Sequence, residues 1–452
     1  MDLKGKNVIV VGLGASGVAA ARLCRRLGAE VTGADDKPAA ELSPAARALG
    51  AEGIAILTGD RGRAALQGAH LIVISPGVPS FAELEAAAST GVEIIGEVEL
   101  ATRFLASGVP IVAIGGTNGK STVTSLTGAL LEAEGRKTFI GGNLGEPLAN
   151  HVDAPWAAVV LEVSSFQMER VSTFAPRVSV LLNVTPDHLD RYSSFDAYVN
   201  AKGNAFVRQT PDDLAVVPHG DVICLREARR GAARIVTFGP GGTIDVSDTE
   251  VHDTRTGARY PRSSFNLAGG HNALNVAAAV AVAGELGVSP KTIARVLKAF
   301  SGLPHRMVLV GEIRGVRYYD DSKGTNVGAV VTALQGLGEP KAVLIAGGRD
   351  KGGSYEPLAA ALRAKGRAAV LIGEAADAIA AAIWASIPVR RAGSMDDAVK
   401  KSAELAVAGD AVILSPACSS FDMFRDYKER GDAFVRAVGD LAARSSGTEA
   451  TP

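Results

Sequence analysis

The chain has few cysteines and almost no net charge, and both shortages exclude classes of protein. Its 452 residues include three cysteines, Cys24, Cys224 and Cys418, which are scattered and odd in number. They form neither a disulfide framework nor a zinc-binding spacing, so we expect a protein of the reducing cytoplasm. A formal net charge of -1 gives no reason to expect nucleic acid or an acidic membrane as partner.

Long hydrophobic runs are also missing. An uncharged stretch over 8–21 follows two lysines and mimics a secretion signal, but three glycines interrupt it and arginines follow at once. A strand and a glycine turn explain this stretch better. No other stretch is long enough to span a bilayer, so we expect no membrane insertion.

Length and pattern predict an α/β protein of three domains, at roughly 150 residues per domain. We predict a Rossmann-like domain over 1–107, a central P-loop ATPase-type domain with a parallel sheet over 108–304, and a C-terminal Rossmann-like domain over 305–452. The segment 301–306 reads as the linker before the last domain, and we expect it to act as a hinge for domain closure.

The central feature is the segment 111–122, in which an apolar run leads into a glycine loop, Gly119-Lys120-Ser121-Thr122 and a helical pattern. Backbone N–H groups of such a loop bind phosphate oxygens, and the helix N-terminus adds partial positive charge. Lys120 would reach the terminal phosphates and Ser121 would hold Mg²⁺. The first glycine of the standard motif would stand at Ile114. We therefore expect nucleoside triphosphate binding.

Polar side chains follow two further strands of this domain. Glu162 ends an apolar strand over 157–161, and His188 follows a strand over 177–182. Ligands bind at the carboxyl ends of parallel strands, so we expect both side chains near the P-loop as Mg²⁺ ligands. The intervening segment 141–145 lacks periodicity and is predicted to be a loop.

Two further positions leave alternatives open. Lys202 falls on the apolar stripe of a helix predicted over 195–207. It either extends its amine to water or is buried, where the amine tends to lose its charge. Asn272 and Asn275 share one face of a later helix. They either cap that helix or contact a base or a metal.

The two outer domains carry their own signals. Residues 12–17 form a GxGxxG turn between a strand and a helix, and an acidic pair follows about twenty residues later. This pattern favours a nucleotide moiety without distinguishing NAD from others. In the last domain, strands over 316–319, 342–346 and 411–414 lead into polar loops rich in glycine or serine, whereas the strand over 368–372 does not. We therefore expect a second ligand edge there.

These motifs together resemble the Mur ligase family, from about residue 7 to residue 431. The likeness rests on the segments 115–122, 162–167, 183–192, 271–272 and 305–306. The segments 321–326 and 414–422 resemble the D-glutamate-adding branch in particular. The resemblance implies that ATP phosphorylates the alanyl carboxylate of UDP-N-acetylmuramoyl-L-alanine and that the amine of D-glutamate attacks the acyl phosphate, in peptidoglycan precursor synthesis. It implies a protein that acts on small molecules, which we expect to be a monomer.

The resemblance also implies residue roles. Lys120, Lys202 and His188 match catalytic positions. Lys202 matches a lysine that becomes carbamylated, and Ser121, Glu162, His188 and the carbamate would hold two Mg²⁺ ions. The positions that match ATP contacts are Gly116, Thr117, Asn118, Gly119, Lys120, Ser121, Thr122, Asn272, Asn275, Arg306 and Asp321. Those that match UDP-substrate contacts are Gly14, Ala15, Ser16, Asp35, Asp36, Lys37, Gly77, Asn143, Ser164 and Gln167. Thr325, Lys351, Ser420, Phe421 and Tyr427 match D-glutamate contacts. Asp36-Lys37 departs from the Thr-Arg pair typical of the family, and Gly324 stands in place of an alanine.

Three alternatives differ in what they leave unexplained. Folylpolyglutamate synthases and other Mur ligases share the ATP loop. The former begin near that loop, whereas here about a hundred residues precede it. The Asp-Asn-Pro-Arg motif of the ligase that adds a diamino acid is missing. An NAD(P)-dependent oxidoreductase leaves Lys120, Glu162 and His188 without a role. A P-loop switch protein would carry an Asn-Lys-x-Asp motif, which the sequence lacks.

Overall fold

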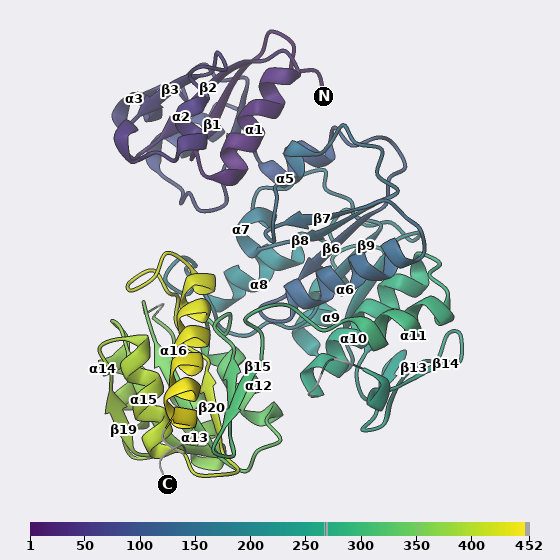
Figure 1. The fold of residues 1–452 in the computed structure, drawn as a ribbon. Helices are drawn as coiled ribbons and strands as arrows, with labels where there is room; N and C mark the ends of the chain where they lie inside the picture. The colour runs from purple at the N-terminus through teal and green to yellow at the C-terminus, as the bar shows by residue number, and fades with distance from the viewer. Residues whose placement is uncertain (266, 268–269, 351, 448–452) are drawn as a thin grey trace. The chain divides into compact units, whose positions relative to one another are not determined.

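The structure is a computed structural model that describes residues 1–265, 267, 270–350 and 352–447, with side chains through residue 444. It shows three α/β regions in chain order (Figure 1). Two compact units are described separately. Unit 1 comprises 1–184, 196–265 and 274–300, and unit 2 comprises the described residues of 185–195, 266–273 and 301–452. Across the described residues, no helix combines the length and apolar character that crossing a bilayer requires. The domain boundaries at 107/108 and 304/305 stay predictions.

The first sheet belongs to unit 1 and has five parallel strands in the order β3-β2-β1-β4-β5. The strands are β1 (Asn7–Val11), β2 (Glu30–Asp35), β3 (Ala55–Thr58), β4 (Leu71–Ile74) and β5 (Glu93–Gly96), and the helices are α1 (Ala15–Arg26), α2 (Pro44–Ala48), α3 (Asp60–Ala64), α4 (Ala82–Ser89) and α5 (Glu97–Thr102). The strand order reverses between β1 and β4, which is where ligands bind in open parallel sheets. Gly17 lies at this point, and a Cβ there would come within 1.8 Å of the carbonyl oxygen of Gly12. Only glycine therefore lets α1 pack so closely on the turn.

The second sheet, also in unit 1, has nine strands in the order β14-β13-β12-β11-β10-β9-β6-β8-β7. The strands are β6 (Ile111–Gly115), β7 (Thr138–Gly142), β8 (Ala158–Glu162), β9 (Val178–Leu181), β10 (Leu214–Pro218), β11 (Arg234–Phe238), β12 (Ile244–Val246), β13 (Glu250–Asp253) and β14 (Ala258–Pro261). The helices are α6 (Lys120–Ala133), α7 (Ser165–Met168), α8 (Phe195–Gly203), α9 (Val222–Ala228), α10 (Gly270–Glu285) and α11 (Pro290–Ala299). Every neighbouring pair along the sheet from β12 to β7 is parallel, including the two pairs that β6 makes. Strands β13 and β14 add an antiparallel edge. The P-loop strand β6 lies between β8 and β9, so the strand ends carrying Glu162 and Asn183 flank the loop.

Two local expectations for this region are wrong. Gly141 and Gly142 lie in strand β7 instead of a loop. A Cβ on Gly142 would meet the carbonyl oxygen of Glu162 at 2.6 Å, so this glycine permits a close backbone approach. Helix α8 ends at Gly203, four residues early, because the chain continues through turns in which Phe206 N–H bonds the carbonyl oxygen of Gly203.

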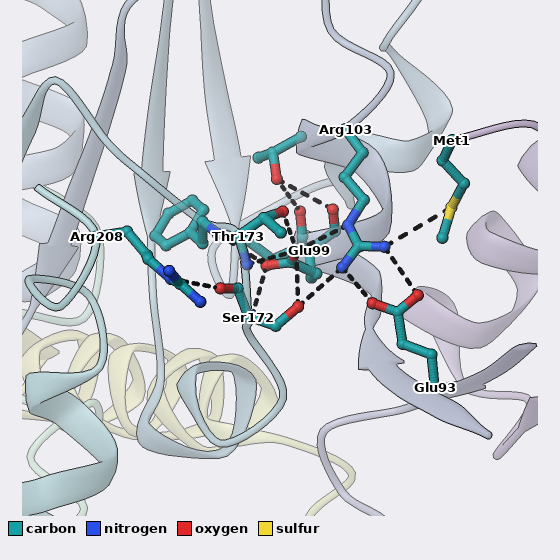
Figure 2. A network of polar contacts seen from close by, with 10 residues as sticks. Met1, Glu93, Glu99, Arg103, Ser172, Thr173 and Arg208 are labelled. Carbon is teal, nitrogen blue, oxygen red and sulfur yellow. Dashed lines mark hydrogen bonds and ion pairs between the residues drawn. The ribbon is translucent and has the colours of Figure 1, made fainter. Parts of the chain in front are cut away.

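Helix α5 packs in one hydrophobic cluster with residues of the first two sheets of unit 1, and its Glu99 and Arg103 belong to the polar network that Figure 2 shows. The carboxylate of Glu99 is fully buried and accepts the backbone N–H groups of Ser172 at 3.0 Å, Thr173 at 2.9 Å and Phe174 at 3.0 Å. Arg103 adds a hydrogen bond of 2.8 Å from Nε. Burial acts to raise the pKa of Glu99, but the donors around it lower that pKa below its usual value. This carboxylate therefore stays charged and ties α5 to the loop after α7.

The third sheet lies in unit 2 and has six strands in the order β15-β16-β20-β17-β18-β19. The strands are β15 (Val308–Ile313), β16 (Val316–Asp320), β17 (Ala342–Gly347), β18 (Gly366–Ile372), β19 (Val389–Arg391) and β20 (Ala411–Leu414), and the helices are α12 (Val327–Gly336), α13 (Glu356–Lys365), α14 (Ala376–Ile383), α15 (Met395–Leu405) and α16 (Tyr427–Gly447). All pairs are parallel except that of β15 with β16. The loops after β16, β17 and β20 therefore open at one edge, as the sequence predicts.

Candidate active site

The P-loop runs from the end of β6 to the start of α6. Gly116 and Gly119 have φ angles of 141° and 85°, which favour glycine and let the backbone curl. The Nζ of Lys120 donates to the carbonyl oxygens of Gly116 at 3.0 Å and Thr117 at 2.7 Å. The ammonium group thus lies across the loop, and the first turn of a fourteen-residue helix lies beside it. This is the geometry of a phosphate-binding loop.

Asn183 holds the loop in shape from the neighbouring strand β9. Its side chain accepts Asn118 N–H at 2.9 Å and donates to the carbonyl oxygen of Asn118 at 3.1 Å, while its own carbonyl oxygen accepts Thr117 N–H at 3.0 Å. Asn183 is not among the residues predicted from the sequence to belong to the site. The available signal was its position directly after an apolar strand, the same position that pointed to Glu162.

Glu162 brings two predicted site residues together. Its carboxylate, 2% exposed, accepts Ser121 Oγ at 2.5 Å and Asn143 Nδ2 at 2.6 Å. In the part of the chain that the structure describes, no group of three or more His, Cys, Asp or Glu side chains could hold a metal. Mg²⁺ usually takes only one or two carboxylates, together with water and phosphate oxygens. A buried carboxylate beside a hydroxyl and a phosphate loop therefore fits this ion.

Lys202 is buried, 6% exposed, so of the two alternatives the structure favours burial. Its Nζ donates to the carbonyl oxygen of Gly116 at 2.9 Å and lies 4.6 Å from the centre of the Tyr198 ring. The Tyr198 hydroxyl in turn lies 3.0 Å from Thr117 Oγ1. Lys202 and Tyr198 thus support the P-loop from α8. Tyr198 appeared in the sequence only as a core residue of that helix.

Three other predicted residues of unit 1 lie close to this loop or to Glu162. Asn275 of α10 packs on Gly119, where a Cβ would come within 2.5 Å of Asn275 Oδ1. Ser164 and Gln167 form a capping box at the start of α7, with Gln167 N–H donating to Ser164 Oγ at 3.2 Å and Ser164 N–H donating to Gln167 Oε1 at 2.9 Å. Both side chains thus have a structural role, and a substrate role for them stays a prediction.

A separate cavity of about 500 Å³ lies at the carboxyl edge of the first sheet. All seven residues predicted there line it, namely Gly14, Ala15, Ser16, Asp35, Asp36, Lys37 and Gly77. Asp35 accepts the backbone N–H groups of Leu13 at 2.7 Å and Lys37 at 2.9 Å. The start of α1 and the end of β2 therefore face one space. Arg63 and Phe81 also line this cavity, and the sequence offered no motif that pointed to either.

In unit 2, His188 lies on the loop 185–194 that precedes α8. Its φ is 56°, and its backbone N–H donates to Asp187 Oδ1 at 3.0 Å. Asp187 also accepts Asn326 Nδ2 at 3.3 Å. His188 and Asn326 line a cavity of about 270 Å³ that reaches Asp350 and Tyr355. The expected approach of His188 to the P-loop stays a prediction.

The loops at the carboxyl edge of the third sheet are joined by a buried arginine. Arg430, 1% exposed, donates from Nη2 to the carbonyl oxygen of Ser322 at 2.7 Å and from Nη1 to that of Cys418 at 3.2 Å. Burial lowers its pKa to about 10. Asp321 is also buried, which raises its pKa to about 7, although it accepts Ser415 Oγ at 2.7 Å. Sequence reasoning missed Arg430 because it lies inside an amphipathic helix without a motif.

The remaining predicted residues of unit 2 occupy different surroundings. Thr325 follows the loop that Arg430 holds, and Ser420 is buried. Tyr427 begins α16, and Lys323 Nζ lies 3.8 Å from the centre of its ring. Phe421 is exposed. Asn272 and Arg306 belong to this unit, whereas Lys351 lies outside the described residues.

The fold and the site define a multidomain P-loop protein. It has a P-loop in a parallel sheet, a cavity at the edge of the sheet that precedes it in the chain, and a third α/β region. Comparison with known families identifies it further. The model of the Mur ligase MurD-like N-terminal domain matches residues 6–96, that of the Mur ligase middle domain matches 114–283, and that of the Mur ligase glutamate ligase domain matches 305–418. The chain belongs to the Mur ligase family.

Relatives and solved structures agree with this assignment. The chain is 44% identical to the UDP-N-acetylmuramoylalanine--D-glutamate ligase of Geobacter metallireducens over 98% of this chain and 99% of that protein. It is 45% identical to the ligase of the same name from Anaeromyxobacter dehalogenans, over 98% and 99%. The fold is similar to that of the MurF ligase of Thermotoga maritima, solved in complex with ADP, with a TM-score of 0.62, 17% identity and coverage of 98% and 96%.

Proposed function

We propose that this chain is an ATP-dependent ligase that joins D-glutamate to UDP-N-acetylmuramoyl-L-alanine in peptidoglycan precursor synthesis. The observation that carries the proposal is the identity of 41–45% to ligases of that name over 97–98% of the chain. The P-loop geometry supports it, because an amide ligase must first activate a carboxylate with a phosphoryl group.

Activation begins at the P-loop in this proposal. An oxygen of the alanyl carboxylate attacks the γ-phosphorus of ATP, the bond to the β–γ bridging oxygen breaks, and ADP leaves. Lys120 and backbone N–H groups at the start of α6 neutralise the phosphates, since the chemistry depends on positioning and charge. Asn272, Asn275, Arg306 and Asp321 complete the proposed ATP contacts.

Mg²⁺ fits the oxygen donors of Ser121 and Glu162 as described above, and when bound it neutralises phosphate charge and polarises the phosphoryl group. His188 and a carbamate on Lys202 are the further proposed ligands, for two ions in all. A carbamate converts the lysine from a cation into an anionic oxygen ligand. This change gives a chemical role to an amine buried beside the first glycine of the loop.

Amide formation follows. The amine of D-glutamate attacks the acyl carbon, a tetrahedral intermediate forms, and phosphate leaves while the amine loses its proton. We propose that Thr325, Lys351, Ser420, Phe421 and Tyr427 hold D-glutamate. The cavity of the first sheet, with its seven predicted lining residues, takes the UDP moiety, and Asn143, Ser164 and Gln167 take the sugar-peptide part.

Mass spectrometry of the reaction products tests this function. The purified chain is incubated with ATP, Mg²⁺, UDP-N-acetylmuramoyl-L-alanine and either D- or L-glutamate. A product heavier by one glutamate residue with the D-enantiomer alone supports the proposal. A product with L-glutamate alone keeps the ligase and overturns the amino-acid substrate. The domain boundaries, the hinge at 301–306, the monomeric state and the cytoplasmic location also remain proposals.

A further inference from the structure

Arg63 is a partly exposed arginine whose side chain has two defined contacts. It projects from α3, and its Nε and Nη2 donate to the two carboxylate oxygens of Asp36 at 3.0 Å and 2.9 Å. Its Cζ lies 5.5 Å from the centre of the Phe81 ring. The carboxylate therefore holds the Nε and Nη2 edge of the guanidinium group, and the Phe81 ring lies beside that group. All three residues line the cavity of the first sheet.

The rest of the guanidinium group is accessible. The Arg63 side chain is 40% exposed, and its Nη1 has no hydrogen-bond partner among the described residues. Arginine planes stack on nucleobases, because the guanidinium is flat, delocalised and weakly hydrated. An arginine held by a bidentate carboxylate and an aromatic ring is prepared for such stacking and loses little side-chain entropy when a base binds.

Position in the fold distinguishes a base contact from a phosphate contact. In Rossmann-like sheets the phosphates bind at the N-terminus of the first helix, and the sugar lies at the end of the second strand. Here these are the start of α1 at Ala15 and the end of β2 at Asp35. Arg63 is bound to Asp36, the residue after β2. It therefore lies at the sugar and base end of the cavity.

We propose that Arg63 stacks on the uracil base of the UDP-sugar substrate, with Asp36 and Phe81 as its positioning residues. This inference rests on the proposed function, because it assumes a uridine nucleotide in the cavity. It gives a physical role to Asp36, which together with Lys37 differs from the Thr-Arg pair expected from the family resemblance. Both oxygens of Asp36 are used to orient Arg63, so the base is held by a side chain from α3.

The test is calorimetric binding of UDP, uridine and pyrophosphate to the full chain and its variants. Arg63→Lys keeps the positive charge but removes the plane. We expect about tenfold weaker binding of UDP and uridine, as for loss of one stacking contact, with pyrophosphate binding unchanged. Arg61→Lys is the matched control, because Arg61 is an exposed arginine on the same helix. This variant should bind all three probes like wild type.

Steady-state kinetics gives a second readout. Arg63→Lys should raise KM for the sugar nucleotide about tenfold and leave kcat unchanged.

Asp36→Asn and Phe81→Leu test the positioning roles. Each should weaken uridine binding less than Arg63→Lys, and neither should weaken it further when combined with Arg63→Lys. Unchanged UDP affinity in Arg63→Lys overturns the proposal. An equal loss for pyrophosphate also overturns it, since Arg63 would then be an anion contact. Wild-type protein that binds no UDP at all instead contradicts the proposed substrate, so the two failures are distinguishable.

Discussion

The Nζ atom of Lys202 donates a hydrogen bond of 2.9 Å to the carbonyl oxygen of Gly116, the first residue of the P-loop. A lysine at this position is 6% exposed, and burying its charge costs free energy. Reaction with carbon dioxide would give an anionic carbamate, which suits the Mg²⁺ site proposed beside the loop.

Lys202→Ala should lose activity by about two orders of magnitude, comparable to the loss of one preorganised catalytic group. Added formate or acetate should recover part of it, because a short carboxylate can replace the carbamate in the space left by the side chain. Lys202→Arg keeps a cation, leaves no such space and should not respond. Lack of recovery in Lys202→Ala, or equal recovery in Lys202→Arg, contradicts carbamylation.

Lys120→Ala should reduce ATP turnover at least hundredfold, or about 3 kcal/mol of transition-state stabilisation. The reason is that the ammonium lying across residues 116 and 117 neutralises charge on the transferred phosphoryl group. Steady-state phosphate release measures this, with an unchanged melting temperature as evidence of folding. Lys4→Ala, which alters an exposed lysine, is the control. Near-normal turnover in Lys120→Ala would overturn the ATP-site assignment.

Glu162→Gln should raise the Mg²⁺ concentration required for half-maximal activity by at least about tenfold, since removing a carboxylate ligand weakens a hard-cation site. Asn143→Asp adds a carboxylate where Asn143 Nδ2 now donates to Glu162. It should disturb the same site through like-charge repulsion. A titration of activity against Mg²⁺ at saturating ATP measures both variants. An unchanged Mg²⁺ requirement in Glu162→Gln would show that this carboxylate holds no metal.

Substitution of two neighbouring glutamates of α5, Glu97 and Glu99, should affect stability with different dependence on pH. Glu97 is buried, which raises its pKa from 4.5 to about 7, although it accepts Ala149 N–H. Between these values the folded state holds a proton that the unfolded state has released. The contribution of the Glu97 carboxyl to the free energy of unfolding is therefore fully present below pH 4.5 and is lost as the pH rises through 7.

Glu97→Gln should thus match wild type at low pH and exceed it by about 3 kcal/mol above pH 7. Glu99→Gln should be destabilised by about 3 kcal/mol at both, because an amide nitrogen would face buried N–H donors (Figure 2). Thermal midpoints measured at about pH 5 and about pH 8 compare the variants. A lower midpoint for Glu97→Gln at high pH would contradict this account.

Sequence reasoning worked where local pattern and topology agree. The order of apolar strand, glycine loop and helix identified the P-loop, and the carboxyl ends of parallel strands brought Glu162 to Ser121. It failed where a contact depends on tertiary packing. Gly142 lies in a strand because the backbone of Glu162 approaches it closely, and Arg430 reaches two loops from the interior of a helix. No spacing along the chain encodes either relationship. Arg63 and Phe81 meet in the same way, through the packing of α3 against α4 on one face of the first sheet.

Phosphate release from ATP is the most direct test of the central claim. The full chain is assayed with Mg²⁺-ATP alone, with UDP-N-acetylmuramoyl-L-alanine added, with D-glutamate added, and with both. The proposed ligase releases phosphate continuously only when both are present, because the acyl phosphate must form on one substrate and be consumed by the other. Sustained release without either substrate would indicate a simple nucleoside triphosphatase and contradict the account.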